Sequence, residues 1–144
     1  MAAERHAEVT WSGDLFHGSG TIESVGSGAF GPLGVTWASR TEQSDGLTSP
    51  EELIAAAHAS CFSMALSNVL AKQGHVAESL STTATVTFVP GTGITTSVLG
   101  VRGVVPGLDE AAFRQAAEDA KETCPVSQAL KGNVELSVTA QLEA

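Results

Sequence analysis

The feature that most constrains the fold is a stretch of 18 residues, 53–70, without a single Asp, Glu, Lys or Arg. A helix start precedes it, because Ser49 can act as the N-cap, Pro50 fits the first helical position, and two glutamates follow at the positive end of the helix dipole. A histidine, an asparagine and four small hydroxyl or thiol side chains make the stretch a poor membrane span. We therefore predict a buried central helix that is apolar on all sides.

A helix of this kind needs more cover than one small domain supplies. The length of 144 residues fits a single domain, 1–144, with no linker, internal repeat or low-complexity segment. Small side chains on the helix would let a second helix approach closely; they are Ala55, Ala56, Ala57, Ala59 and Ala65. We expect a homodimer in which sheets from both chains wrap the two central helices.

The remaining sequence alternates between strand and helix patterns. Strands are predicted over 8–11, 21–25, 34–39, 81–89, 95–105 and 134–142. A second helix should begin after Asp109, and its apolar stripe consists of Ala112, Phe113, Ala116, Ala117 and Ala120. This order of elements indicates an α+β fold.

Charge and composition exclude several classes of partner. The formal net charge of −9, with only seven Lys and Arg residues, opposes binding to nucleic acid or to an anionic membrane surface. The four histidines are scattered and neither cysteine belongs to a metal-binding spacing, so we expect no metal and no cofactor. The first residues lack the apolar core of a signal peptide, which favours a cytoplasmic location.

Two cysteines make redox chemistry the leading hypothesis, because disulfides in a reducing cytosol are mostly transient, catalytic or sensing. Cys61 lies in the uncharged helix, where apolar surroundings would raise its pKa unless a cation reaches it. Cys124 precedes Pro125 at an expected helix break, so backbone N–H groups would stabilise its thiolate. These arguments favour Cys124 as the reactive thiol. The alternative is that both cysteines simply fill the core.

Residues 50–66 resemble the signature helix of the osmotically inducible protein C family, and residues 124–130 resemble its second cysteine motif. The similarity extends to residues 11–14 and 106–109, and so covers nearly the whole chain. The family also includes the organic hydroperoxide resistance proteins. The resemblance implies an α+β fold and an intertwined homodimer. In such a dimer, antiparallel-rich sheets wrap a long central helix and the active sites lie at the dimer interface.

Carried over residue by residue, the resemblance makes Cys61 the peroxidatic thiol and Cys124 the resolving thiol, with Arg40 and Glu51 as polar partners of Cys61. This reverses the choice made from local chemistry. The implied activity is thiol-dependent reduction of organic hydroperoxides, and more slowly of hydrogen peroxide, in stress defence. Cys61 becomes a sulfenic acid that condenses with Cys124 to a disulfide. A dithiol reductant, which the family suggests is lipoyl-linked, restores both thiols.

Helix geometry limits the part that Glu51 can play. It precedes Cys61 by ten positions, or about 15 Å of axial rise, so the two cannot touch within one straight helix. We predict that Glu51 either reaches Cys61 from the other protomer or acts through Arg40, while Glu52 is solvated. The alternative for Arg40 is a solvated charge at the end of a strand. His58, one turn before Cys61, is either a base or a hydrogen-bonded core residue.

A preference for organic hydroperoxides would require an apolar pocket beside Cys61. The candidates are Phe30, Leu33, Leu47, Phe62 and Met64, each of which could equally be ordinary core. The rival function is a non-enzymatic ligand-binding or redox-sensing stress dimer.

Overall fold

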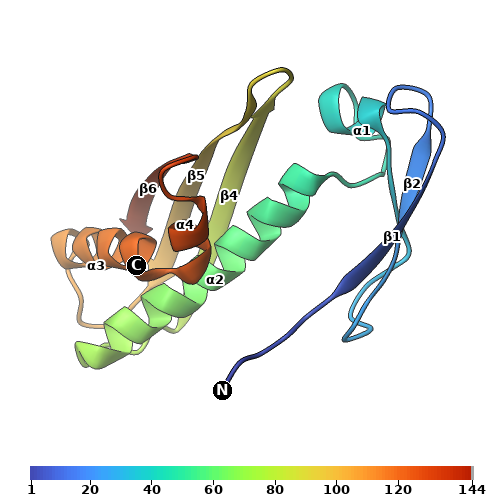
Figure 1. Cartoon of the computed structure of the whole chain (residues 1–144). Helices are drawn as coiled ribbons and strands as arrows, with labels where there is room; N and C mark the ends of the chain where they lie inside the picture. The colour runs from blue at the N-terminus through green and yellow to red at the C-terminus, as the bar shows by residue number, and fades with distance from the viewer. Residues whose placement is uncertain (144) are drawn as a thin grey trace. The chain divides into compact units, whose positions relative to one another are not determined.

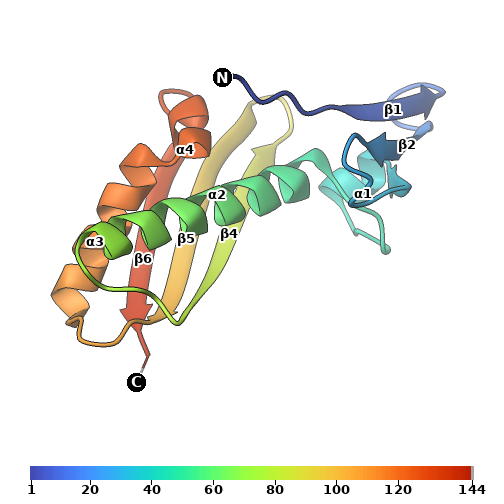
Figure 2. The ribbon, with the colours of Figure 1, turned by 90° about the horizontal axis from the view of Figure 1, so that it is seen from below.

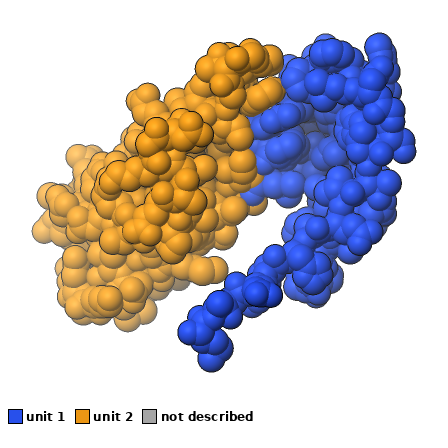
Figure 3. Space-filling view, in the orientation of Figure 1, with its two compact units in different colours: residues 1–53 blue, residues 54–144 orange. Residues whose placement is uncertain are grey.

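The computed structural model describes residues 1–143 and divides into two compact units, Met1–Leu53 and Ile54–Ala144 (Figure 1 and Figure 3). The boundary falls inside the long helix α2, Pro50–Lys72. The expectation of one domain over residues 1–144 stays a prediction.

Unit 1 contains a three-stranded sheet in the order β1-β2-β3. Strand β1, Ala7–Ser12, pairs antiparallel with β2, Ser19–Val25, and β2 pairs antiparallel with the short β3, Leu33–Val35. The two strands predicted around residues 8–11 and 21–25 are therefore confirmed, and they form a hairpin.

The strand predicted over residues 34–39 is wrong beyond Val35, because a short helix, α1, spans Trp37–Thr41. Its start is a capping box. The hydroxyl of Thr36 accepts the N–H of Ser39 at 3.0 Å, and the hydroxyl of Ser39 accepts the N–H of Thr36 at 3.0 Å. This reciprocal pairing satisfies backbone donors that an extended chain would have left to a neighbouring strand. Arg40 therefore lies in the last turn of a helix and not at the end of a strand.

Unit 2 contains a second three-stranded sheet in the order β4-β5-β6. Strands β4, Ser79–Val89, and β5, Gly93–Val104, form the predicted antiparallel pair. Strand β6, Glu135–Leu142, runs parallel to β5, and helices α3, Glu110–Thr123, and α4, Pro125–Leu130, lie between them in the sequence. A parallel pair needs such a crossover connection. Figure 2 shows α2, α3 and α4 on the same face of this sheet.

The core of unit 2 lies between this face and the helices. Phe62, Leu66 and Leu70 recur at four-residue spacing on α2 and are completely buried. They belong to one apolar cluster with residues of β5 and α3, namely Leu99, Val101, Phe113, Ala116, Ala117 and Ala120. Gly103 is required beside Phe113, because a Cβ there would lie only 2.6 Å from the Phe113 ring. The apolar stripe predicted on the second helix is therefore the face that packs.

The opposite face of α2 is exposed in the single chain. Over residues 54–70 its exposed members carry no charge; they are Ala56, Ala57, Ser60, Met64, Ser67 and Asn68. Among the residues that the structure describes, α2 is the one helix long and apolar enough to cross a membrane, although its buried stripe belongs to the core of unit 2. Burial of this helix on all sides would need a further covering surface.

Candidate active site

The structure brings the two cysteines of unit 2 together. Cys61 is half-buried on α2, and Cys124 is completely buried at the junction of α3 and α4. Both are free thiols, and Cys124 lies close enough to Cys61 to raise the pKa of its thiol. Two sulfurs separated by 63 positions in the sequence are thus already neighbours in the reduced protein.

Cys124 is placed by the break between two helices. Its N–H donates to the carbonyl of Ala120 at 2.9 Å and ends α3, while the residue serves as N-cap of α4 with Pro125 in the first position. The predicted break is confirmed. Its predicted effect is wrong, because the Cys124 sulfur accepts no capping hydrogen bond from α4. The N–H of Val126 donates to the sulfur of Cys61 instead, since Cys61 approaches the first turn of α4 from α2.

The surroundings of Cys61 within unit 2 favour its neutral form. Burial raises the pKa of the Cys61 thiol, and the hydrogen bond and charge of Cys124 raise it further. The N–H of Val126 acts in the opposite direction, because it donates to the thiolate. A nucleophilic Cys61 therefore needs a positive charge, as its position on an uncharged helix already suggested.

The strongest ion pair of unit 1 joins the other two predicted site residues. Nε of Arg40 donates to Oε1 of Glu51 at 3.0 Å, and Nη2 donates to Oε2 at 2.8 Å. Glu51 is only 7% exposed, so it is not in bulk water. The Arg40 guanidinium also lies 5.9 Å from the ring centroid of Trp37, one turn earlier on α1. A bidentate pair of this kind fixes the guanidinium in one orientation.

The pair gives Glu51 the contact with Arg40 that one of its two predicted alternatives, action on Cys61 through Arg40, requires. Glu52 is exposed, as predicted, and accepts the hydroxyl of Thr48 at 2.9 Å. Ser49 accepts the N–H of Glu52 at 3.1 Å, which confirms the predicted cap of α2. The ion pair belongs to unit 1 and the thiol pair to unit 2.

His58 is a hydrogen-bonded core residue, one of the two roles predicted for it. It is completely buried in unit 2, with Nδ1 2.6 Å from Oγ of Ser97 and Nε2 2.8 Å from Oγ of Ser127. Burial lowers the pKa of the imidazole, which keeps it neutral. Sequence reasoning missed both serines. Ser127 could have been noticed because it belongs to the second cysteine motif, whereas nothing distinguishes Ser97 among the hydroxyl residues of β5.

A mainly apolar groove of about 450 Å³ opens beside Cys61. It is lined by Cys61, Met64, Ala65, Asn68, Val69, Lys72, Thr123 and Pro125. Of the predicted pocket residues, Met64 lines this groove, whereas Phe62 is completely buried in the core. The other three candidates, Phe30, Leu33 and Leu47, belong to unit 1.

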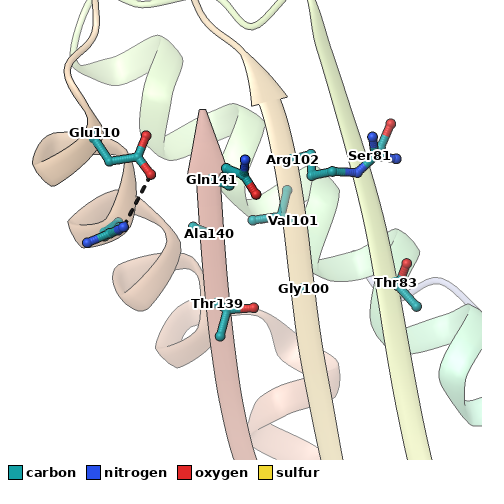
Figure 4. A pocket seen from close by; sticks show the side chains of 10 residues that line it. Ser81, Thr83, Gly100, Val101, Arg102, Glu110, Thr139, Ala140 and Gln141 are labelled. Carbon is teal, nitrogen blue, oxygen red and sulfur yellow. Dashed lines mark hydrogen bonds and ion pairs between the residues drawn. The ribbon is translucent and has the colours of Figure 1, made fainter. Parts of the chain in front are cut away.

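A second cavity of unit 2, of about 500 Å³, lacks a thiol (Figure 4). It is lined by residues of β4, β5, β6 and α3, with Gly100 between Thr83 and Thr139. Its two arginines each pair with a glutamate. Those ion pairs are exposed and contribute little to the stability of the fold. Among residues 1–143 no cluster of three His, Cys, Asp or Glu side chains could hold a metal ion.

Comparison with known proteins gives consistent matches. Residues 43–139 match the family model described as OsmC-like protein. The chain is 40% identical to peroxiredoxin OsmC of Escherichia coli (strain K12) over 139 residues, which is 94% of this chain and 96% of that protein. It is 35% identical over 98 residues to an organic hydroperoxide resistance protein of Xanthomonas axonopodis pv. citri (strain 306), covering 64% of this chain and 66% of that protein.

A solved structure has the same fold. The organic hydroperoxide resistance protein OhrB of Bacillus subtilis superposes with a TM-score of 0.67 at 25% sequence identity. The match covers 96% of this chain and 98% of that one.

Proposed function

The chain belongs to the OsmC-like protein family, and from this premise we propose that it is a thiol-dependent peroxidase for organic hydroperoxides. The observation that carries the proposal is the proximity of Cys61 to Cys124, whose two sequence neighbours line the same groove as Cys61. The names of the relatives, a peroxiredoxin and an organic hydroperoxide resistance protein, support the same class of reaction.

The first step is attack by the Cys61 thiolate on the terminal oxygen of the hydroperoxide. A sulfur–oxygen bond forms while the oxygen–oxygen bond breaks, and the departing alkoxide takes up a proton to leave as an alcohol. Cys61 is oxidised to a sulfenic acid. Half-burial of Cys61 leaves it open to a small substrate, whereas the completely buried Cys124 is less suited to this step.

The second step forms the disulfide. The thiolate of Cys124 attacks the sulfur of oxidised Cys61, the sulfur–oxygen bond breaks, and the departing hydroxide takes up a proton to leave as water. A dithiol then reduces the disulfide by exchange through a mixed disulfide. We propose a lipoyl-linked dithiol as the reductant and the cytosol as the compartment, in keeping with the reversible use of the pair.

The role that we propose for Arg40 and Glu51 is to lower the raised pKa of Cys61. We propose that Arg40 supplies the positive charge that favours the Cys61 thiolate, and that Glu51 orients its guanidinium. The resemblance of residues 50–66 to the signature helix and the bidentate geometry of the pair support this role.

The groove beside Cys61 supports an organic substrate. Met64, Ala65 and Val69 give it a surface that can take up an alkyl or aryl group next to the thiol. Hydrogen peroxide has no such group, so the burial of apolar area would favour organic hydroperoxides.

The same region supports a homodimer. The uncharged face of α2 is exposed in the single chain, and a second copy is the natural cover for it. We propose that the protein acts as this dimer.

Stopped-flow kinetics of the reduced protein with cumene hydroperoxide and with hydrogen peroxide test the proposed function. We expect faster oxidation by cumene hydroperoxide, and loss of all rapid oxidation in the Cys61→Ser variant. The matched Cys124→Ser variant should keep the first step but accumulate a sulfenic acid that dimedone traps. Slow oxidation of both sulfurs without preference between the two peroxides would instead favour a packing role for the cysteines.

A further inference from the structure

His58 and Ser127 form a buried contact next to the two thiols. His58 lies three positions before Cys61 on α2, and Ser127 lies three positions after Cys124 at the start of α4. His58 Nε2 is 2.8 Å from Ser127 Oγ, and both side chains are shielded from solvent. The histidine therefore connects the helix that carries one sulfur to the helix that carries the other.

Two neighbouring contacts, one between the cysteines and one between His58 and Ser127, join α2 to the start of α4. Residues three apart on a helix lie on the same face, one turn from each other. One contact joins Cys61 to Cys124, and the other joins His58 to Ser127. The order is reversed between the two helices, because the earlier residue of α2 contacts the later residue of α4. The contact between His58 and Ser127 therefore also fixes where Cys124 lies relative to Cys61.

Hydrogen-bond chemistry makes the contact between His58 and Ser127 specific. A neutral imidazole has one N–H donor and one acceptor nitrogen, so one serine hydroxyl accepts from it and the other donates to it. Ser97 on β5 occupies Nδ1 at 2.6 Å, which holds the ring from the sheet side. Loss of either serine would leave a buried ring nitrogen without its partner, which is costly. His58 thus anchors α4 to α2 and, through Ser97, to the central strand of the sheet.

We infer that His58 is a positioning residue which, through Ser127, holds α4 in the register that brings Cys124 against Cys61. This inference rests on the proposed function, because it assigns His58 to the second step, disulfide formation. His58 does not touch the peroxide and takes no proton from it. The effect acts on the approach of the Cys124 sulfur to the Cys61 sulfur, and misplacement of one reacting group by about 1 Å costs about 100-fold in rate.

Ser127→Ala is the direct test, with Ser97→Ala as its matched control. Both variants remove one hydroxyl from the same buried imidazole, but only Ser127 belongs to α4. The oxidation of Cys61 and the formation of the disulfide are followed separately after one equivalent of cumene hydroperoxide. We expect Ser127→Ala to leave the first rate unchanged and to slow disulfide formation by about 10-fold or more. Ser97→Ala should change disulfide formation by no more than about twofold, and Ser127→Thr, which keeps the hydroxyl, should restore it.

A second measurement is independent of peroxide. The equilibrium between the reduced protein and glutathione disulfide reports how readily the two thiols pair, and it should shift against the protein disulfide in Ser127→Ala by a factor similar to the change in rate. Equal disulfide formation in Ser127→Ala and the parent, or equal slowing by Ser97→Ala, would overturn the positioning role. Failure of cumene hydroperoxide to oxidise Cys61 would instead count against the proposed function, and the glutathione equilibrium would still decide the role of His58.

Discussion

Among the individual residues, Cys61 poses the sharpest energetic problem. Burial and the neighbouring Cys124 raise its pKa, while one backbone N–H, from Val126, opposes them. The thiolate is the nucleophile, so a raised pKa leaves little reactive sulfur at neutral pH. The proposed activity therefore depends on a positive charge near Cys61.

Replacing Arg40 tests the source of that charge. A cation close to an ionisable group shifts its pKa by about 1–3 units, so Arg40→Gln should raise the pKa of Cys61 by about one unit or more. The rate of oxidation at neutral pH should fall about 10-fold in parallel. The pKa is measured from the ultraviolet absorbance of the thiolate in a Cys124→Ser background.

Two further variants separate charge from orientation. Arg40→Lys keeps the charge but loses the bidentate contact with Glu51. The pKa of Cys61 should therefore be lower in Arg40→Lys than in Arg40→Gln. Arg102→Gln, at an exposed arginine of β5, is the control and should leave the thiol unchanged. If the pKa of Cys61 is the same in the parent and in Arg40→Gln, Arg40 is not the cation.

The residues of the candidate site were only partly predictable. Cys61 and Cys124 were predicted from the residues alone, whereas their separate roles and the choice of Arg40 and Glu51 came from the resemblance. The ion pair between Arg40 and Glu51 follows the expected chemistry of a bidentate contact. Local reasoning assigned the backbone donors of α4 to Cys124, but the donor at Val126 serves Cys61. That contact joins two helices distant in sequence, and neither spacing nor propensity contains it.

Among the elements, α2 carries a pH-dependent contribution through His58. Its pKa is lowered from 6.5 in the folded state, so the unfolded chain binds more protons below this pH. The contribution is fully present above pH 6.5 and is lost as pH falls through the lower folded-state value. The free energy of unfolding of the parent should therefore decrease with acidification, by up to about 1.4 kcal/mol per pH unit.

Denaturant unfolding at several pH values, for the parent and a His58→Asn variant, measures this contribution. The variant should be less stable at neutral pH, and the difference between the two proteins should narrow as pH falls below 6.5. The other three histidines, His6, His17 and His75, are common to both proteins and cancel in the comparison. A stability difference that is constant with pH would contradict a neutral, buried His58.

Elements with strong local signals were predictable, and elements that depend on distant partners were not. The start of α2 and the β4–β5 hairpin follow from Ser49, Pro50 and alternating apolar residues. Helix α1 has five residues, too few to show a helical period, and its capping box uses Ser39 where Glu or Gln is usual. The parallel pairing of β6 with β5 depends on tertiary contacts, which the alternation of apolar and polar residues within each strand does not reveal.

For the whole molecule, the exposed face of α2 predicts self-association. Ala57→Glu would place a charge in the proposed interface, where desolvation costs several kcal/mol. Ala111→Glu makes the same change at an exposed site on α3 and is the matched control. Analytical ultracentrifugation should show a dimer for the parent and for Ala111→Glu, and a monomer for Ala57→Glu. A monomeric parent would show that this face of α2 is not a dimer interface.

In the proposed mechanism Cys61 and Cys124 act as one reversible pair, and a map of the disulfide bonds shows whether they do. The reduced protein is treated with one equivalent of cumene hydroperoxide, alkylated and digested without reductant, and the linked peptides are identified by mass spectrometry. We expect one bond, between Cys61 and Cys124 of the same chain, and its complete loss after treatment with dihydrolipoamide. Both sulfurs alkylated as free thiols, or a bond that joins two chains, would rule out this mechanism.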